Sequence, residues 1–351
     1  MSAGKECTPN DEIRRASTRI NSGIDHDDLV AFDPLFASVP LPHKLVLFPY
    51  GFPAHIKTND PTIIRAAEVI WGQFTARFHE NPVELRVLVS SASCRHGPRP
   101  PVFRAQANLF TVVSDGNNYG CCDLATGFGF AHLTRNAALR LDFVRYYFLE
   151  GMIYSLLDTQ YIATIHAACV GRKGSGVLLV GEEGAGKSSL AYACSRRGWT
   201  YVSDDASSLV IRRKGRTVIG NPRAFRFRPS AALLFPELQR YVKHRAEESM
   251  FEARTESFPK LKTAQELEIQ YVIFLKRNVF DDEEESLTPV ERADRFRRLF
   301  QNRWPPELPI HENRMAAIER LIEAPAYELS YCDLDRAVNL LERLLDKQLQ
   351  C

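Results

Sequence analysis

One segment of the chain has the residue types and spacing of a phosphate-binding loop. Gly181-Glu-Glu-Gly-Ala-Gly-Lys187-Ser188 fits the Walker A pattern G-x-x-x-x-G-K-[ST] completely, between an apolar run and a predicted helix. The glycines let backbone N–H groups converge on an anion, and the positive end of the helix adds to that field. We therefore predict ATP binding, with Lys187 on the β/γ phosphates and Ser188 on Mg²⁺. The predicted nucleotide-binding residues are Gly181, Glu182, Glu183, Gly184, Ala185, Gly186, Lys187, Ser188 and Ser189.

Two carboxylates lie within this anion-binding loop. Glu182 and Glu183 can point to solvent, because only backbone groups line such a nest. They should nevertheless weaken nucleotide binding or require compensating charge. A phosphate loop disabled by these glutamates is therefore one alternative.

Two aspartates and a histidine could complete a phosphotransfer site. Asp204 and Asp205 follow a predicted strand at residues 200–203, which should lie beside the strand before the loop. One aspartate is needed to hold Mg²⁺, directly or through water, and the second could accept the proton of an incoming hydroxyl. Alternatively, Asp205 caps a turn. His166, in the preceding predicted strand, either contacts the γ-phosphate or is a core residue.

A basic stretch follows the aspartates. Arg226 and Arg228 would share one face of a strand with Phe227 on the other, and Arg223 precedes them. Their guanidinium groups could clamp phosphates or an acidic acceptor. The alternative is that they are ordinary surface charges or cap a helix.

These signals together resemble the bacterial HPr kinase/phosphorylase family. The resemblance rests on His166-Ala-Ala, the loop ending in Lys187-Ser188, Arg196-Arg-Gly198 and the doubled aspartate, and it covers about residues 163–229. It implies an α/β phosphate-loop kinase domain related to phosphoenolpyruvate carboxykinase. It also implies an ATP- and Mg²⁺-dependent serine kinase with Asp205 as base and Asp204 on the metal. His166 would then lie near the γ-phosphate.

The sequence also departs from that family. The family loop usually carries a serine where Glu183 stands, and residues 220–229 replace its acidic-arginine-glycine segment. The first third of the chain does not look like the usual N-terminal domain. HPr as acceptor and the phosphorylase reaction are therefore open, and the chain looks more like divergent HPr-kinase-like proteins, some of which modify ribosomally made peptides.

The surrounding elements divide the chain into three parts. Residues 1–28 are predicted to form a flexible tail, and residues 29–158 a small α+β module with a linking helix. Residues 159–351 are predicted to form the kinase-like domain. The module should contain strands at 43–50 and 83–89 and helices at 61–79 and 140–157. In the last part, strands at 163–170, 176–180 and 200–203 alternate with a helix ending at Gly198, which favours a largely parallel sheet. A final amphipathic helix is expected at 333–349.

Composition excludes several classes of protein. The 351 residues are 45% hydrophobic and 25% charged, as in a soluble globular protein, and a net charge of +2 argues against nucleic-acid or membrane-surface partners. The longest apolar runs are too short for a membrane span, and the N-terminus lacks an apolar signal core, so we expect a cytoplasmic protein. The eight cysteines form no CxxC pair and are expected to be buried or idle thiols.

Two functions from different classes fit these features. The first is a kinase that transfers the γ-phosphoryl group of ATP to a hydroxyl of a protein, peptide or small molecule. The second is a nucleotide-binding switch or assembly module with at most slow ATP hydrolysis. The doubled aspartate and His166 favour the kinase. The family's frequent oligomers make a homo-oligomer possible.

Overall fold

The computed structural model describes residues 33, 35–91, 97–242, 250–278, 284–300 and 312–348. It divides into two compact units, Met1–Gln160 and Tyr161–Cys351, whereas the sequence expectation placed a boundary between residues 158 and 159. The expected tail, residues 1–28, lies outside the described residues. Among the helices described, none is long and apolar enough to cross a bilayer.

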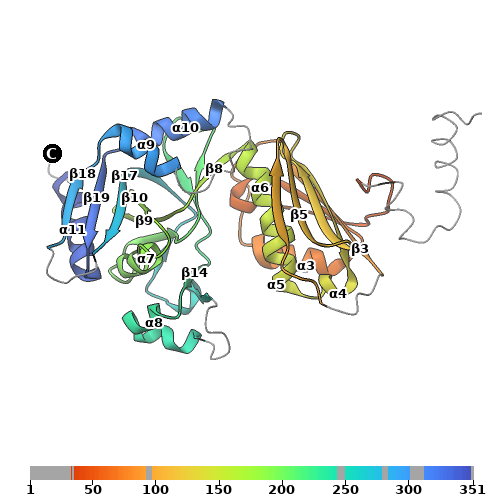
Figure 1. Ribbon diagram of the computed structural model, residues 1–351, viewed down its shortest axis with the longest axis horizontal. Helices are drawn as coiled ribbons and strands as arrows, with labels where there is room; N and C mark the ends of the chain where they lie inside the picture. The colour runs from red at the N-terminus through yellow and green to blue at the C-terminus, as the bar shows by residue number, and fades with distance from the viewer. Residues whose placement is uncertain are drawn as a thin grey trace, which may run out of the picture. The chain divides into compact units, whose positions relative to one another are not determined.

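The first unit is built on a seven-stranded mixed sheet of order β1-β2-β3-β7-β6-β5-β4. Helices α3 and α6 pack against it (Figure 1), and the Trp71 indole donates to the Tyr154 hydroxyl at 3.1 Å to join them. The elements are β1 (His43–Leu47), β2 (Ala54–Thr58), α3 (Pro61–Trp71), β3 (Val83–Ser90), β4 (Val102–Gln106), β5 (Leu109–Asp115), β6 (Asn118–Asp123), β7 (Phe128–Thr134), α4 (Arg135–Ala138), α5 (Leu141–Phe143), a π-helical segment (Val144–Glu150) and α6 (Gly151–Gln160).

Helix α3 is shorter than the sequence indicated. Asp60 caps its start by accepting from the Thr62 N–H at 2.8 Å, and Pro61 occupies the first turn. The helix ends at Trp71, so the prediction of a helix to residue 79 was wrong. Beyond it, the N–H groups of Arg77 and Phe78 donate to the Gly51 carbonyl, an interaction distant in sequence. The expected helix at 140–157 is confirmed, as the run from α5 through the π-helical segment to α6.

The second unit holds a ten-stranded sheet and a separate two-stranded sheet, β14 with β15. Its elements are β8 (Ile162–Ile165), β9 (Ala167–Arg172), β10 (Ser175–Val180), α7 (Lys187–Arg196), β11 (Thr200–Ser203), β12 (Ser207–Val210), β13 (Thr217–Ile219), β14 (Ala224–Phe227), α8 (Ala231–Leu234), β15 (Phe251–Arg254), β16 (Lys262–Thr263), β17 (Glu266–Arg277), β18 (Ser286–Pro289), α9 (Arg292–Phe300), α10 (Glu312–Ile322), β19 (Ala326–Tyr331) and α11 (Leu334–Gln348). The protein is thus mixed α/β.

The large sheet is not largely parallel, and that prediction was wrong. Strand β10 is parallel to β17 but antiparallel to β9, because a two-residue turn with positive φ at Lys173 and Gly174 makes a hairpin of β9 and β10. The single strand expected at 163–170 is split at His166 into β8 and β9, which pair with different neighbours. Strand β11 pairs with β9, so it does not lie beside β10 as expected.

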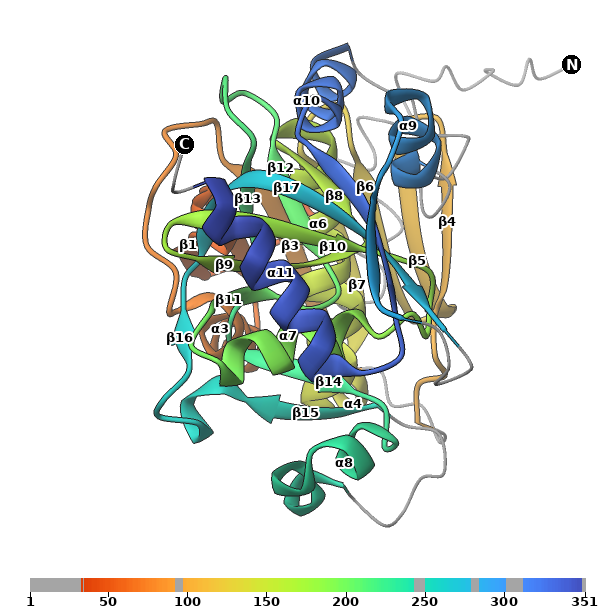
Figure 2. The ribbon, with the colours of Figure 1, turned by 90° about the vertical axis from the view of Figure 1, so that its left-hand side faces the viewer.

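Alternating side chains of β10 supply the two faces of this sheet. Val177 and Leu179 enter one core with α7 and α11, and Leu178 and Val180 enter another with α10. Figure 2 shows α7 and α11 side by side across the first face. This arrangement fixes the direction of α7, whose first turn follows the end of β10.

Several strand ends meet at one edge of the sheet. Strands β10 and β11 are both antiparallel to β9, so they run in the same direction and both end where β9 begins. Strands β17 and β19 are parallel to β10 and end at the same edge. The residues just past these ends, and His166 just before β9, are therefore brought together.

Candidate functional site

The glycine loop, residues 181–186, connects β10 to α7. Gly184 and Gly186 have φ of 87° and 91°, which side-chain-bearing residues rarely adopt. A side chain at Gly186 would also collide with the Tyr331 hydroxyl, which donates to the Ala185 carbonyl at 2.8 Å. Gly186 is the N-cap of α7, and Leu190 closes the first turn by donating to its carbonyl. The helix therefore directs its N-terminal N–H groups into the space above the loop.

Lys187 lies folded over the loop. Its ammonium donates to the carbonyls of Gly181 at 2.8 Å and Glu182 at 3.0 Å, and the residue is only 6% exposed. The charge is thus held beside the N-terminus of α7, where an anion would have to lie.

The two aspartates have different environments. Asp204 is buried, and its carboxylate accepts from the Tyr201 hydroxyl at 3.1 Å and from the Arg226 N–H at 2.7 Å. Burial raises the pKa of Asp204 to about 6, although these hydrogen bonds oppose the shift. The Ser188 hydroxyl donates to the Asp204 carbonyl at 3.5 Å. The Asp204 backbone therefore borders the loop while its carboxylate is turned inward.

Asp205 faces a cavity together with His166. Its side chain is 47% exposed, and one carboxylate oxygen lies 3.0 Å from His166 Nδ1, which is also 3.1 Å from the Asp205 carbonyl. The cavity encloses about 360 Å³, and Lys187 and Ser188 also line it. His166, Asp205 and residues of the glycine loop thus line the same cavity, whereas the buried Asp204 does not line it.

Of the three arginines singled out in the sequence, two line this cavity. Arg226 is on β14 and pairs with Glu252 at 3.2 Å, while Arg228 pairs with Glu183 at 2.6 Å. The alternation expected around Phe227 is confirmed, because Phe227 is buried and Arg226 is half-buried. Arg223 is not among the lining residues, and its carbonyl accepts from the Thr255 N–H.

The loop glutamates are both exposed, and Glu183 lines the cavity described above. The side chain of Glu183 is 78% exposed and is neutralised by Arg228, which supplies the compensating charge that the sequence required. Glu182 lines a separate cavity with Gly181 and Ala185.

Arg277 is a lining residue that the sequence analysis missed. It ends β17, and its side chain makes no hydrogen bond or ion pair with other described residues. The available signal was the apolar run at 271–275 ending in Lys276 and Arg277. Only the parallel pairing of β17 with β10 places this guanidinium at the edge of the glycine loop.

The pKa of Asp204 leads to a prediction for the ligand-free protein. The folded protein keeps a proton on Asp204 up to about pH 6, whereas the unfolded chain releases it near pH 3.8. The free energy of unfolding should therefore fall as the pH rises from 3.8 to 6. The slope is at most about 1.4 kcal/mol per pH unit. Denaturant unfolding at pH 4.5 and pH 6.5 measures this pH dependence. We expect the Asp204→Asn variant to lose the part of the decrease in unfolding free energy that Asp204 causes. Asp335→Asn, an exposed carboxylate of the same unit, should keep it, and equal slopes in both variants would contradict the assignment.

No family model matches the chain. It is similar to the HPr kinase/phosphorylases of Chlorobium luteolum (38% identity over 97 residues, 27% of this chain and 27% of that protein) and Chlorobium phaeobacteroides (40% over 98 residues, 28% and 26%). The match thus spans about a quarter of those relatives. The resemblance found in the sequence is confirmed over this part of the chain.

A solved structure, the Hpr(Ser) kinase/phosphatase from Coxiella burnetii, also matches. The alignment covers 53% of this chain and 97% of that one, with 13% identity and a TM-score of 0.31.

Proposed function

We propose that the second unit is an ATP-dependent kinase that transfers the γ-phosphoryl group to the hydroxyl of a serine in a protein or peptide. The observation that carries this proposal is the shared cavity: Lys187 and Ser188 line it together with Asp205 and His166. A phosphate-binding loop beside a half-exposed carboxylate is the arrangement that in-line phosphoryl transfer needs. The similarity to proteins named HPr kinase/phosphorylase supports the same reaction class.

The residues of the cavity have distinct parts in this proposal. Backbone N–H groups at the start of α7 and the Lys187 ammonium bind the phosphate oxygens. Asp205 accepts the proton of the acceptor hydroxyl. His166 Nδ1 lies 3.0 Å from the Asp205 carboxylate and holds that carboxylate toward the cavity. Arg226, Arg228 and Arg277 add positive charge around the transferred group.

The oxygen donors at the loop fit a magnesium ion. Mg²⁺ favours hydroxyl, carboxylate and water oxygens. In this proposal the Ser188 hydroxyl would hold it directly and the inward-turned Asp204 through water, since Ser188 lines the cavity and Asp204 does not. When bound, the metal would neutralise negative charge on the phosphate oxygens.

Transfer of labelled phosphate tests the proposal. The full chain is incubated with γ-labelled ATP, Mg²⁺ and candidate serine-containing proteins and peptides, including HPr and products of neighbouring genes. Label on a hydroxyl of one acceptor is expected. Slow ATP hydrolysis with no acceptor labelled across the panel would instead support a nucleotide-binding switch.

The pair between Glu183 and Arg228 leads to a second prediction. Glu183→Gln should tighten Mg·ATP binding by roughly three- to fivefold at low salt, because it removes an anion next to the triphosphate and releases Arg228. Titration calorimetry at low and high salt measures the change. Glu182→Gln is the matched control, since Glu182 lies outside this cavity and should change affinity less. Weaker binding by Glu183→Gln would show that the pair instead holds Arg228 in its binding position.

A further inference from the structure

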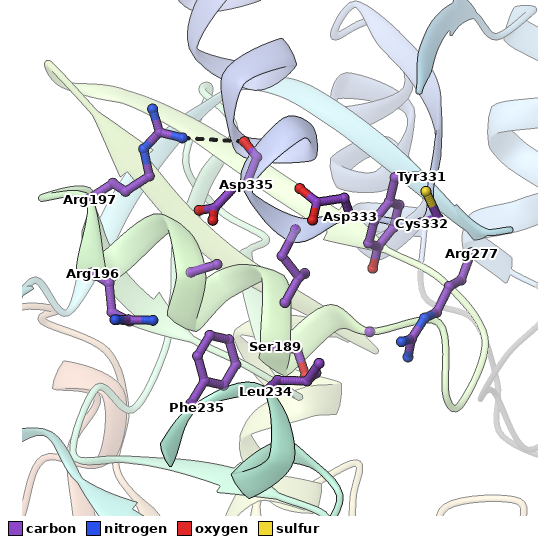
Figure 3. Close-up of a pocket in the computed structure, with 13 residues that line it drawn as sticks. Ser189, Arg196, Arg197, Leu234, Phe235, Arg277, Tyr331, Cys332, Asp333 and Asp335 are labelled. Atoms are coloured by element: carbon purple, nitrogen blue, oxygen red, sulfur yellow. Dashed lines mark hydrogen bonds between the residues drawn. The ribbon is translucent and has the colours of Figure 1, made fainter. Parts of the chain in front are cut away.

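A second cavity opens beside the glycine loop and has no part in the chemistry described so far. It encloses about 400 Å³, within the roughly 300–1,000 Å³ range of small-molecule sites. Figure 3 shows its walls: α7 on one side, Leu234 and Phe235 on another, and the residues after β19 on a third. It lies toward β17 and β19, whereas Asp205 and His166 lie toward β9 and β11.

The two cavities adjoin at the start of α7. Gly186, Ser189 and Arg277 line both of them. From there the second cavity follows Ser189, Ala193 and Arg196, whose spacing of three or four residues places them on one face of the helix. At a rise of about 1.5 Å per residue, this face extends about 15 Å from Gly186 to Arg196. A ligand whose phosphates lie at the N-terminus of α7 can therefore extend along the helix into this space.

The chemistry of the second cavity differs from that of the first. The first cavity holds Lys187 and three arginines, which suit a triphosphate. The second also holds three arginines, including the shared Arg277, but it has no lysine and adds two apolar side chains and two carboxylates, those of Leu234, Phe235, Asp333 and Asp335. The Arg196 guanidinium lies 5.5 Å from the centre of the Phe235 ring and offers a flat cationic surface. An aromatic base can pack on such surfaces, and carboxylates accept hydrogen bonds from sugar hydroxyls or a base amino group.

We propose that this second cavity binds the nucleoside of the nucleotide whose phosphates lie at the glycine loop. The inference rests on the proposed function, because the γ-phosphate must point toward Asp205. The nucleoside end of the nucleotide then points toward β17 and β19, where Gly186 and Ser189 line the second cavity. The ligand class is a nucleoside triphosphate, recognised by its base and sugar as well as by its phosphates.

A pair of neighbouring leucines allows a matched test. Leu234 lines the cavity and is 45% exposed, whereas Leu233, on the same short helix, is 81% exposed and lines neither cavity. Binding of Mg·ATP and of Mg·tripolyphosphate, which has no nucleoside, is measured for the full chain by titration calorimetry. Leu234→Trp should weaken ATP binding about tenfold and change tripolyphosphate binding less than about twofold. Leu233→Trp should change neither.

The outcomes separate this inference from the proposed function. If Leu234→Trp leaves ATP binding unchanged, or weakens ATP and tripolyphosphate equally, the nucleoside does not occupy this cavity, while a kinase at the glycine loop stands. If the unaltered protein binds neither compound, the proposed function fails and the inference with it. Thermal melting of both variants verifies that they are folded.

Discussion

Asp205→Asn is expected to lower phosphoryl transfer by about 10³-fold while ATP affinity stays within about threefold of the unaltered protein. Asparagine keeps the shape of the side chain but cannot accept a proton from the acceptor hydroxyl. The structure favours Asp205 over Asp204 for this part, since Asp205 lines the cavity and Asp204 is buried with both carboxylate oxygens hydrogen-bonded. Single-turnover transfer from γ-labelled ATP to the acceptor found by the screen measures the effect.

Asp346→Asn is a suitable control for this experiment. The Asp346 side chain is 45% exposed, close to the 47% of Asp205, and it pairs with Arg172 and Lys173 at the hairpin between β9 and β10. That hairpin is at the opposite end of β10 from the glycine loop, so transfer should be unchanged. If Asp205→Asn transferred phosphate at the original rate, Asp205 would not be the base. If it lost ATP binding instead, Asp205 would belong to the phosphate or metal site.

The second large effect is expected at Lys187. Lys187→Met should weaken Mg·ATP binding about 100-fold and reduce transfer at least as much, because the only change in the loop is the loss of a charge that contacts phosphate. Methionine has a similar length and can occupy the same buried position above the carbonyls of Gly181 and Glu182. Titration calorimetry gives the affinity, and thermal melting shows whether the variant is folded.

Lys173→Met controls for the change in net charge. Lys173 is exposed at the hairpin between β9 and β10, far along β10 from the loop. Its replacement should leave ATP affinity unchanged. Equal affinity in Lys187→Met and the unaltered protein would mean that the loop does not bind the triphosphate through this lysine.

The local elements around the loop could be predicted because their signals lie within short stretches of sequence. The apolar run 176–180 became β10, and α7 ends before Gly198, whose φ of 86° is the left-handed conformation expected after a helix. The final amphipathic helix, α11, was predicted for the same reason. Each depends on interactions among residues close together in the chain.

The sheet order could not be predicted in this way. A strand is defined locally, but its neighbours are chosen by packing across the whole unit. The sequence therefore placed β11 beside β10, whereas β9 lies between them. Asp205 still lines the cavity beside the loop, because β10 and β11 run in the same direction on either side of β9. Arg277 was missed because it depends on the pairing of β17 with β10, about ninety residues apart in the sequence.

The difference between the two aspartates was also invisible in the sequence. A doubled aspartate does not reveal which side chain is turned inward. In the structure, the Tyr201 hydroxyl and the Arg226 N–H hold Asp204 inward, and Arg226 comes from a separate strand, β14. Burial and exposure, which give the two residues their different parts in the proposed reaction, arise only after these strands are assembled.

A crystal structure with Mg²⁺ and a non-hydrolysable ATP analogue tests the central claim most directly. We predict the β- and γ-phosphates at the start of α7, with the Lys187 ammonium moved from the Gly181 and Glu182 carbonyls onto phosphate oxygens and the γ-phosphate facing Asp205. A nucleotide bound elsewhere, or Lys187 still bonded to those carbonyls with the analogue present, would contradict the account.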